Sequence, residues 1–290
     1  MDHLVTATAA GGTLRVHAAV TTELVAEARG RHDLAPTASA ALGRLLTASA
    51  LMGGSLKGAQ RVVLQVAGDG PLRNLLAEAF PDGEGLGVRG YALHPEVDLP
   101  LSAAGKFDVG AAVGSGVLQV TRTLESGQPY TGIVRLVSGE IGDDVAAYFA
   151  QSEQTPCVVA LGVLANPAGI LAAGGIVAEL LPGAADHAVD QLERAAAALP
   201  PVTSLVREGA SPWDLVQRLV GDLEPKHLRR LATRFACRCS REKIEVAIRG
   251  LGPQALREMA CESRPQTVTC EYCARVYEVT PDEVAAIAAR

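Results

Sequence analysis

The sequence predicts an α+β protein with a mostly antiparallel sheet, and two observations carry that prediction. Before residue 181, candidate strands follow one another with few helices between them, which favours antiparallel pairing. Beyond residue 236, five of the six cysteines gather in a short segment, a pattern typical of a small metal-binding module rather than a secreted disulfide scaffold. We therefore expect a body of packed sheet and helices at 1–180, a metastable helical linker at 181–235 and a zinc-binding module at 236–290.

The body is predicted from hairpin signals and two helical patterns. Gly11-Gly12 separates two β-prone runs, 4–9 and 13–20, as a hairpin turn would. Residues 37–51 and 141–151 place apolar side chains at helical spacing, so both segments are predicted helices. Further strands are expected at 61–67, 86–92, 116–124, 132–137, 157–164 and 170–180.

The linker is predicted to hold two short amphipathic helices. One covers 186–199 and ends at Pro200-Pro201, and the other begins at Ser211-Pro212 and covers 211–221. Helices of this length are marginal alone in water, so their apolar faces must lie on another part of the protein. The residues that such helices would expose on detaching are Val189, Leu192, Leu215 and Leu219.

The strongest chemical signal is a Cys-x-Cys followed, 30 residues later, by a Cys-x-x-Cys. Cys237 and Cys239 point to one face of an extended segment, and Cys270 and Cys273 converge from a tight turn. Two such pairs supply the four soft donors of a tetrahedral zinc ion. The same thiolates are what an oxidant attacks first, so the pattern is compatible with two uses, as a structural staple and as a redox sensor, and the spacing alone does not decide which dominates. The ligand set leaves no open position for water, which argues against a zinc hydrolase.

The rest of the module is expected to be helical, with one hairpin. We predict helices at 241–249, 254–259 and 281–289, and a zinc-knuckle hairpin from 268–270 and 275–279. Cys261 is interpreted as a buried helix-end residue and Cys157 as a core residue of a strand. Neither has the paired spacing of the other four cysteines.

Charge and hydropathy restrict the partners. Residues 1–224 carry 14 basic and 24 acidic side chains, a balance of −10, whereas residues 225–290 carry 12 and 8, a balance of +4. Basic Arg238, Arg241 and Lys243 would favour thiolates nearby. The acidic total and the scarcity of aromatic residues argue against a nucleic-acid-binding protein.

The segment between Gln154 and Glu179 has no charged residue and could be mistaken for a membrane span. Glycines and a proline interrupt its apolar residues, so we expect a soluble, cytoplasmic protein without a membrane span.

Two other classes remain as alternatives. A thiol–disulfide oxidoreductase would use the Cys270–Cys273 segment as its redox pair, at a helix start that follows a strand. A zinc-ribbon nucleic-acid module would use the basic C-terminal region. The histidines are scattered, and no Ser/His/Asp or Cys/His arrangement can be defended from spacing, so we expect no enzyme.

Several segments together resemble the heat-shock protein 33 family of redox-regulated holdase chaperones. The two cysteine segments, 237–242 and 270–273, are the most specific. The others are Gly68-Asp69-Gly70-Pro71, Val113-Gly114-Ser115-Gly116, Tyr130-Thr131-Gly132, Tyr148-Phe149 with Ser152-Glu153-Gln154, and Ala172-Ala173-Gly174-Gly175. The match runs nearly end to end. Ala274 stands where the family often has glycine, which would strain the knuckle, and Cys261 is an additional thiol.

The resemblance implies one zinc ion on Cys237, Cys239, Cys270 and Cys273 in an inactive reduced form. It implies that oxidation forms the disulfides Cys237–Cys239 and Cys270–Cys273 and releases zinc. We expect the module then to melt, because zinc supplies most of its folding free energy. The linker helices would detach, and the exposed apolar surface would bind unfolding client proteins under oxidative stress, without ATP. Dimerisation of the activated form is implied by the resemblance alone.

Overall fold

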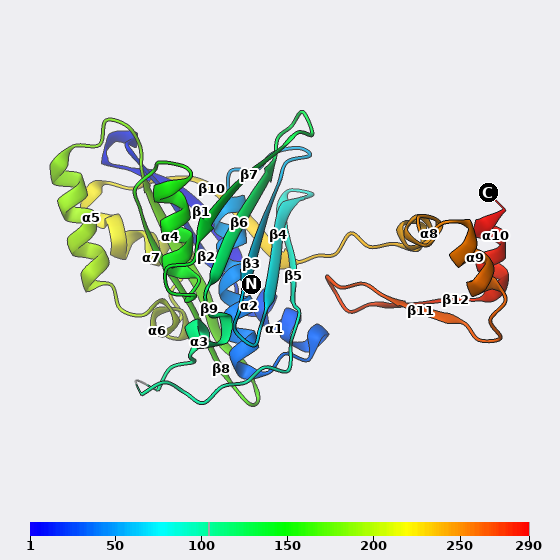
Figure 1. Cartoon of the computed structure of the whole chain (residues 1–290). Helices are drawn as coiled ribbons and strands as arrows, with labels where there is room; N and C mark the ends of the chain where they lie inside the picture. The colour runs from blue at the N-terminus through cyan, green and yellow to red at the C-terminus, as the bar shows by residue number, and fades with distance from the viewer. Residues whose placement is uncertain (104, 290) are drawn as a thin grey trace. The chain divides into compact units, whose positions relative to one another are not determined.

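The computed structural model describes residues 1–103 and 105–289. The chain forms two compact units, of which the first is Met1–Ala236 and the second begins at Cys237 (Figure 1). Within the described residues, no helix combines the length and the hydrophobicity that crossing a lipid bilayer requires.

The first unit is built on one ten-stranded sheet. Its strands are β1 His3–Ala9, β2 Leu14–Val20, β3 Arg61–Gly68, β4 Asn74–Asp82, β5 Gly85–Ala92, β6 Gly116–Thr123, β7 Pro129–Arg135, β8 Cys157–Asn166, β9 Gly169–Leu180 and β10 Lys226–Phe235. They are ordered β7-β6-β3-β4-β5-β10-β1-β2-β9-β8. Every neighbouring pair is antiparallel except β5 and β10, which run parallel over 233–235. The predicted class, α+β with a mostly antiparallel sheet, is confirmed.

Helix α2, Pro36–Gly53, fills the centre of this unit and contacts strands from both halves of the sheet. Its small residues allow close packing, since a Cβ on Gly43 would lie 2.7 Å from the Val25 side chain. Buried hydroxyls are satisfied locally, as where Thr47 Oγ1 donates to the Gly43 carbonyl at 2.8 Å. Helix α1, Thr22–His32, and the short α3, Val109–Val113, pack beside α2. Helix α4, Gly142–Gln151, contacts both edge strands, β7 and β8.

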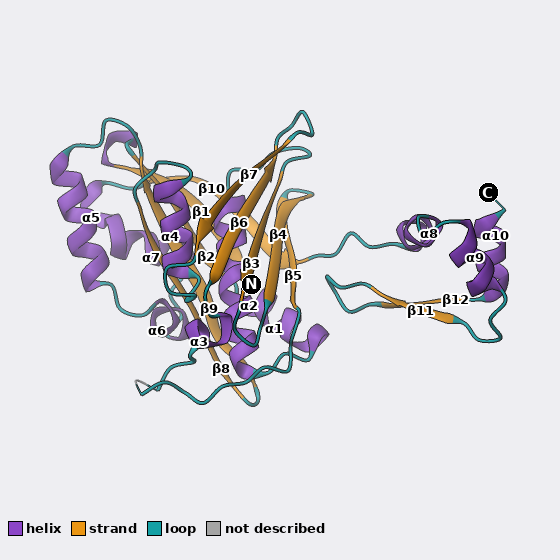
Figure 2. Ribbon diagram, viewed as in Figure 1, coloured by secondary structure: helices purple, strands orange, loops and turns teal. Residues whose placement is uncertain are grey.

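Three further helices cover the opposite face of β1, β2 and β9 (Figure 2). They are α5 Asp186–Ala198, α6 Val202–Arg207 and α7 Pro212–Val220. Ser211 accepts from the Asp214 backbone N–H and the Asp214 carboxylate accepts in return, so α7 begins with a complete capping box. We call α5–α7 the lid.

Residues 226–235, expected in the helical linker, form strand β10, and this part of the prediction is wrong. Leu231, Thr233 and Phe235 are buried while Ala232 and Arg234 are exposed, which is the two-residue period of a strand. The four basic residues of the segment hid that period. The structural unit therefore continues through Ala236, although the division into body, linker and module as functional regions remains a prediction.

Strand β4 and helix α1 were not predicted, and charge hid both. Glu78 sits in the middle of β4 with its side chain 2% exposed, and Arg89 Nε donates to it at 2.7 Å. In α1 only Leu24, Val25 and Ala28 are buried. The Asp2 carboxylate accepts from the Leu24 N–H at 2.7 Å and so satisfies a backbone donor at the helix start.

The second unit has the elements that the sequence predicts. They are α8 Arg241–Arg249, α9 Pro253–Ala260, the hairpin β11 Gln266–Thr269 and β12 Val276–Val279, and α10 Pro281–Ala288. Its core is small: Ile244, Ile248, Leu256, Val279, Val284 and Ile287. Arg241 pairs with Glu283 at 2.6 Å and also donates to the Glu278 carbonyl, which ties α8 to the hairpin and α10.

Candidate metal centre

Four thiols converge at one end of the second unit. Cys237 and Cys239 lie in the extended segment before α8, and Cys270 and Cys273 lie in the turn between β11 and β12. Their Sγ atoms all lie within 4.8 Å of one another. The sequence prediction that these two pairs face each other is therefore met by the geometry.

The distances suit a tetrahedral ion better than a disulfide. Cys237 Sγ lies 3.8 Å from Cys270 Sγ, and Cys239 Sγ lies 3.5 Å from Cys273 Sγ. Four sulfurs at 2.3 Å from a zinc ion are separated by about 3.8 Å, whereas bonded disulfide sulfurs are about 2.05 Å apart. All four thiols are free. The donor set and its spacing therefore fit zinc, held without an open coordination position.

The turn that presents Cys270 and Cys273 is fixed by three backbone bonds. Cys270 N–H donates to the Arg275 carbonyl at 2.9 Å, and the N–H groups of Cys273 and Ala274 donate to the Cys270 carbonyl at 3.2 and 2.8 Å. This closure requires Ala274 to adopt φ +56°, in the left-handed region. The strain that the sequence predicted at this alanine is present, because a Cβ disfavours that region.

Burial makes the thiols of Cys270 and Cys273 weak acids in the absence of a cation. It raises the pKa of Cys273 to about 12. Burial also raises the pKa of Cys270, with a further contribution from the charge of Cys237. A divalent ion would reverse this preference, because coordinated cysteine is deprotonated.

One neighbour of the sulfurs was not predicted from the sequence. The Tyr277 hydroxyl, on β12, donates to Cys239 Sγ at 3.1 Å. Such a hydrogen bond stabilises a thiolate ligand from outside the coordination sphere. The pairing of Tyr277 with Val268 across the hairpin sets this contact, and a single sequence does not reveal cross-strand register.

Two basic residues near the site, Lys243 and Arg241, make contacts that tie the unit together. Lys243 Nζ donates to the Arg238 carbonyl at 2.6 Å, across the start of α8. Arg241 pairs with Glu283 and, at 4.0 Å, with Glu245. These contacts are to oxygen atoms, so the predicted support of thiolates by lysine and arginine is at most indirect for Lys243 and Arg241.

The two remaining cysteines lie outside the cluster. Cys261, expected to be buried, is exposed at the end of α9, because the apolar face of that helix turns Leu256 rather than its last residue inward. Cys157 lies in β8, opposite Glu179 in β9. Burial, followed by the charge of Glu179, raises the pKa of Cys157 to about 12. A thiol of that pKa is a poor nucleophile, which agrees with a structural role.

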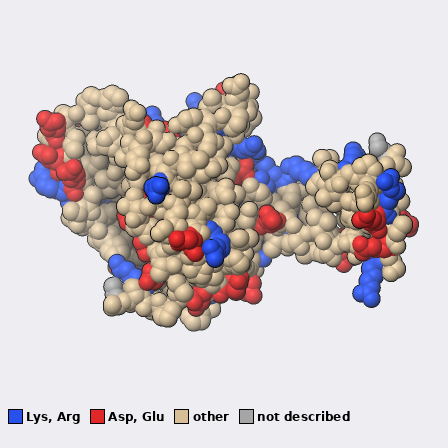
Figure 3. Space-filling view, viewed as in Figure 1, with Lys and Arg blue, Asp and Glu red and all other residues tan. Residues whose placement is uncertain are grey.

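The apolar residues predicted to meet clients belong to the lid helices α5 and α7. Leu192, Leu215 and Leu219 are at most 2% exposed, and Val189 is half-buried. Leu192, Leu215 and Leu219 belong to one core cluster that also contains Val16, Ala18 and Ile176 of the sheet. The outward face of α5 carries charged side chains of both signs (Figure 3). A client can reach the three leucines only if the lid moves.

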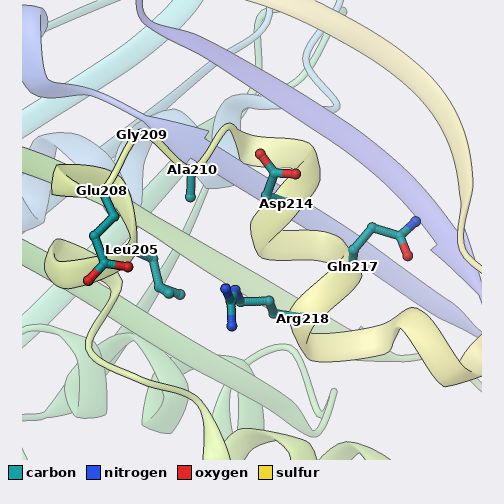
Figure 4. A pocket seen from close by; sticks show the side chains of 7 residues that line it. All are labelled: Leu205, Glu208, Gly209, Ala210, Asp214, Gln217 and Arg218. Atoms are coloured by element: carbon teal, nitrogen blue, oxygen red, sulfur yellow. The ribbon is translucent and has the colours of Figure 1, made fainter.

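The lid is loosely fitted. A groove of about 520 Å³ lies between α6 and α7, where Arg218 points toward Leu205 and Glu208 (Figure 4). Grooves of about 390 and 480 Å³ lie along α5, and Gln191 lines both. The buried Gln191 Oε1 has no hydrogen-bond partner among the described residues. An orphaned acceptor of this kind costs roughly 1–3 kcal/mol and weakens the docked lid.

The oxidoreductase alternative loses its structural basis. Cys270 and Cys273 lie in a hairpin turn rather than at a helix start after a strand. Their raised pKa values oppose the depressed pKa that such a nucleophile needs.

Comparisons with known proteins agree over nearly the whole chain. The family model described as Hsp33 protein matches residues 2–280. A 33 kDa chaperonin of Symbiobacterium thermophilum is 46% identical over 285 residues, covering 98% of this chain and 96% of that protein. The 33 kDa chaperonin of Desulforamulus reducens is 43% identical over 277 residues, with 95% and 93% covered. The crystal structure of a 33 kDa chaperonin from Thermotoga maritima superposes with a TM-score of 0.90 at 33% identity, covering 99% and 97%.

Proposed function

This chain belongs to the Hsp33 protein family, and on that premise we propose that it is a redox-regulated holdase chaperone, inactive when reduced and active when oxidised. The observation that carries the proposal is the convergence of four free thiols within 4.8 Å in a unit whose own core is small. The proposal includes a cytoplasmic location, unfolding proteins as partners and no enzymatic activity.

Cys237, Cys239, Cys270 and Cys273 would hold one zinc ion in the reduced protein. When bound, the ion would cross-link the two cysteine segments of the second unit. In small zinc modules the free energy of metal binding contributes on the order of 10–16 kcal/mol to folding. The six buried apolar side chains contribute about 1.5–3 kcal/mol each, which is of the same order as the metal but is far less than the conformational entropy cost of ordering the whole unit, at about 1–2 kcal/mol per residue. The second unit is therefore proposed to depend on its thiolates for its fold.

Oxidation would remove the ligands in pairs. For each pair, two thiolates lose two electrons and the S–S bond forms, while one hydrogen peroxide takes up these two electrons and two protons from the solvent and gives two waters. The pairs that we propose are Cys237–Cys239 and Cys270–Cys273. Such disulfides close tiny loops and restore little stability, because the entropy that they remove from the unfolded chain is small.

Unfolding of the second unit is proposed to release the lid. Three features of the lid support this proposal. Its helices are short, grooves lie between and along them, and the Gln191 Oε1 atom has no hydrogen-bond partner among the described residues. Release would expose Val189, Leu192, Leu215 and Leu219 together with the sheet face beneath. A contiguous apolar surface of this kind binds unfolded chains without ATP. It can also join two copies, so we propose a homodimer for the activated form.

The test compares metal content, free thiols and chaperone activity on one sample. The reduced protein should contain one zinc ion and should not suppress the aggregation of a thermally unfolding test protein, as followed by light scattering. Peroxide should consume four thiols, release the metal and produce suppression. The variant C261S should behave like the wild type, whereas C239S should lack metal and suppress aggregation without peroxide. Metal release that leaves suppression unchanged would refute the mechanism.

A further inference from the structure

A polar cavity lies inside the first unit, on the sheet face turned away from the lid. Its volume is about 290 Å³. Strands β2, β6 and β9, the end of α2, and α4 with the turn after it all contribute to its wall. The polar lining consists of Arg15, His17, Ser55, Arg122, Glu153 and Glu179. The proposed redox switch uses none of these residues.

One charged pair in the wall is complete. Arg122 Nε donates to Glu153 Oε1 at 3.0 Å, and the Tyr148 hydroxyl donates to the same oxygen at 2.8 Å. The turn beyond Glu153 is fixed, since Thr155 N–H donates to the Phe149 carbonyl at 2.9 Å and Gln154 adopts φ +53°. Arg122 and Glu153 therefore already have hydrogen-bond partners within the protein.

The second charged pair is incomplete. Arg15 Nη1 lies 3.7 Å from Glu179 Oε2, and His17 Nε2 lies 3.9 Å from Glu179 Oε1. Both distances exceed a hydrogen bond. Within the described residues, neither the Glu179 carboxylate nor the Arg15 guanidinium has a hydrogen bond to another protein group. Yet the Glu179 side chain is only 13% exposed, and a buried carboxylate normally has donors.

His17 fixes the floor of the cavity without adding charge. Its Nδ1 lies 3.1 Å from Thr6 Oγ1, and Ser55 Oγ lies 3.4 Å from its Nε2. A Cβ on Gly54 would lie 2.5 Å from the imidazole, so the glycine makes room for the ring. Burial, followed by the charges of Arg15 and Arg122, lowers the pKa of His17 to about 4. The ring is therefore neutral near pH 7.

The two groups of this pair that lack hydrogen bonds define what the cavity can hold. They are the Arg15 guanidinium and the Glu179 carboxylate, which lie 3.7 Å apart, so the complementary ligand carries a carboxylate and an ammonium close together. Leu51, Phe149 and Val177 add an apolar part to the wall. We propose that the cavity binds a small zwitterion, a free α-amino acid with an aliphatic side chain, through its carboxylate to Arg15 and its ammonium to Glu179.

The test is isothermal titration calorimetry on the full-length reduced protein, with L-leucine as the probe. Two analogues carry only one charge each: 4-methylpentanoate lacks the ammonium, and 3-methylbutylamine lacks the carboxylate. L-Leucine should bind with saturable heat at one site. Each analogue should bind about tenfold or more weakly, because one charged hydrogen-bonding group is left without a partner.

Variants locate the binding. Glu179→Gln and Arg15→Gln should each weaken L-leucine binding by about tenfold or more. Glu27→Gln is the matched control, since Glu27 pairs with Arg31 on the exposed face of α1, and it should leave binding unchanged. Thermal unfolding of each variant establishes that it is folded. The proposal is overturned by an absence of saturable heat, by analogues that bind as tightly as L-leucine, or by unchanged affinity in folded Glu179→Gln and Arg15→Gln. None of these outcomes depends on the redox state of the cysteines.

Discussion

At the scale of single residues, the backbone conformation of Ala274 lowers the stability of the turn that presents Cys270 and Cys273. The turn needs a left-handed residue so that the Cys270 carbonyl can accept two bonds, and alanine fills the position at φ +56°. An L-residue with a Cβ adopts this region at a cost of roughly 1–2 kcal/mol. This strain lowers the stability of the folded second unit, which is proposed to unfold on oxidation.

Replacing this alanine should strengthen the unit. Ala274→Gly should raise the free energy of unfolding of the metal-loaded second unit by about 1 kcal/mol, since glycine tolerates the left-handed region but loses more chain entropy. The measurement is the urea concentration at which a chromogenic chelator captures the metal. Ala286→Gly, at an exposed position inside α10, should lower the stability by a similar amount. Equal effects of both substitutions would contradict the role given to the turn.

His17 should make the first unit sensitive to acid. Its pKa in the folded state, about 4, lies below that of a free histidine, so the unfolded chain binds more protons between pH 6.5 and 4. Stability is therefore lost as the pH falls through this range, by about 2 kcal/mol between pH 7 and pH 5 from this group alone. Urea denaturation of wild type and His17→Gln, with a chelator present so that the second unit contributes equally, should show this difference.

Two carboxyl groups act in the opposite direction. Burial raises the pKa of Asp2 to about 6 and also raises that of Glu179, so both stabilise the folded state as the pH falls. Because both groups are present in wild type and in His17→Gln, the comparison isolates the histidine. An identical pH dependence of the two proteins would show that the imidazole does not titrate as described.

The residues of the cysteine site could be predicted because metal-ligand spacing is local. Two short chelating pairs identify their chemistry without knowledge of the fold. Tyr277 and the polar cavity could not be predicted, since they depend on which strands lie side by side. Arg15 and Arg122 line one cavity although they come from strands six positions apart in the sheet order.

At the scale of elements, the lid is the part whose stability governs the proposed switch. Helix α5 buries Ala188 and Leu192 but also carries the unpartnered Gln191 into its contact with the rest of the unit. Docking of the lid is therefore favoured by the burial of apolar side chains and opposed by the buried amide oxygen of Gln191. Replacing that amide by an apolar group should stabilise the docked lid.

Gln191→Leu should stabilise the docked lid by about 1 kcal/mol and reduce aggregation suppression at equal disulfide content. Trp213, the single tryptophan, lies in α7 and reports lid movement by its fluorescence. Gln151→Leu, an exposed glutamine at the end of α4, is the matched control and should change neither signal. Activity unchanged in Gln191→Leu despite a more stable lid would separate the lid from client binding.

Prediction of elements succeeded where the local pattern of residue types is clear. Residues 37–51 place Ala and Leu at helical spacing and form α2, and residues 116–124 alternate and form β6. It failed at β4, α1 and β10, where charged residues are neutralised by partners distant in sequence or lie on exposed strand faces. Arg234, for example, pairs at 2.7 Å with Asp82 of β4, which no local pattern reveals.

At the scale of the whole molecule, β10 limits how far opening can spread. The strand lies between β5 and β1, so its removal would divide the sheet. We therefore expect hydrogen exchange in the oxidised, metal-free protein to rise at α5–α7 and throughout the described part of the second unit, 237–289. Residues 226–235 should remain as protected as in the reduced form. Rapid exchange in β10 would mean that opening disrupts the body itself.

The place of β10 also has a consequence for biosynthesis. Strands β1 and β5 are both made within the first third of the chain, but the strand that joins them is translated only after residue 225. Until then a ribosome carries two partial sheets with unsatisfied edges, which are sites of intermolecular pairing. The nascent chain is thus itself a candidate for protection by other folding factors, and the completion of its sheet at Phe235 comes just before Cys237, the first of the four clustered cysteines, is made.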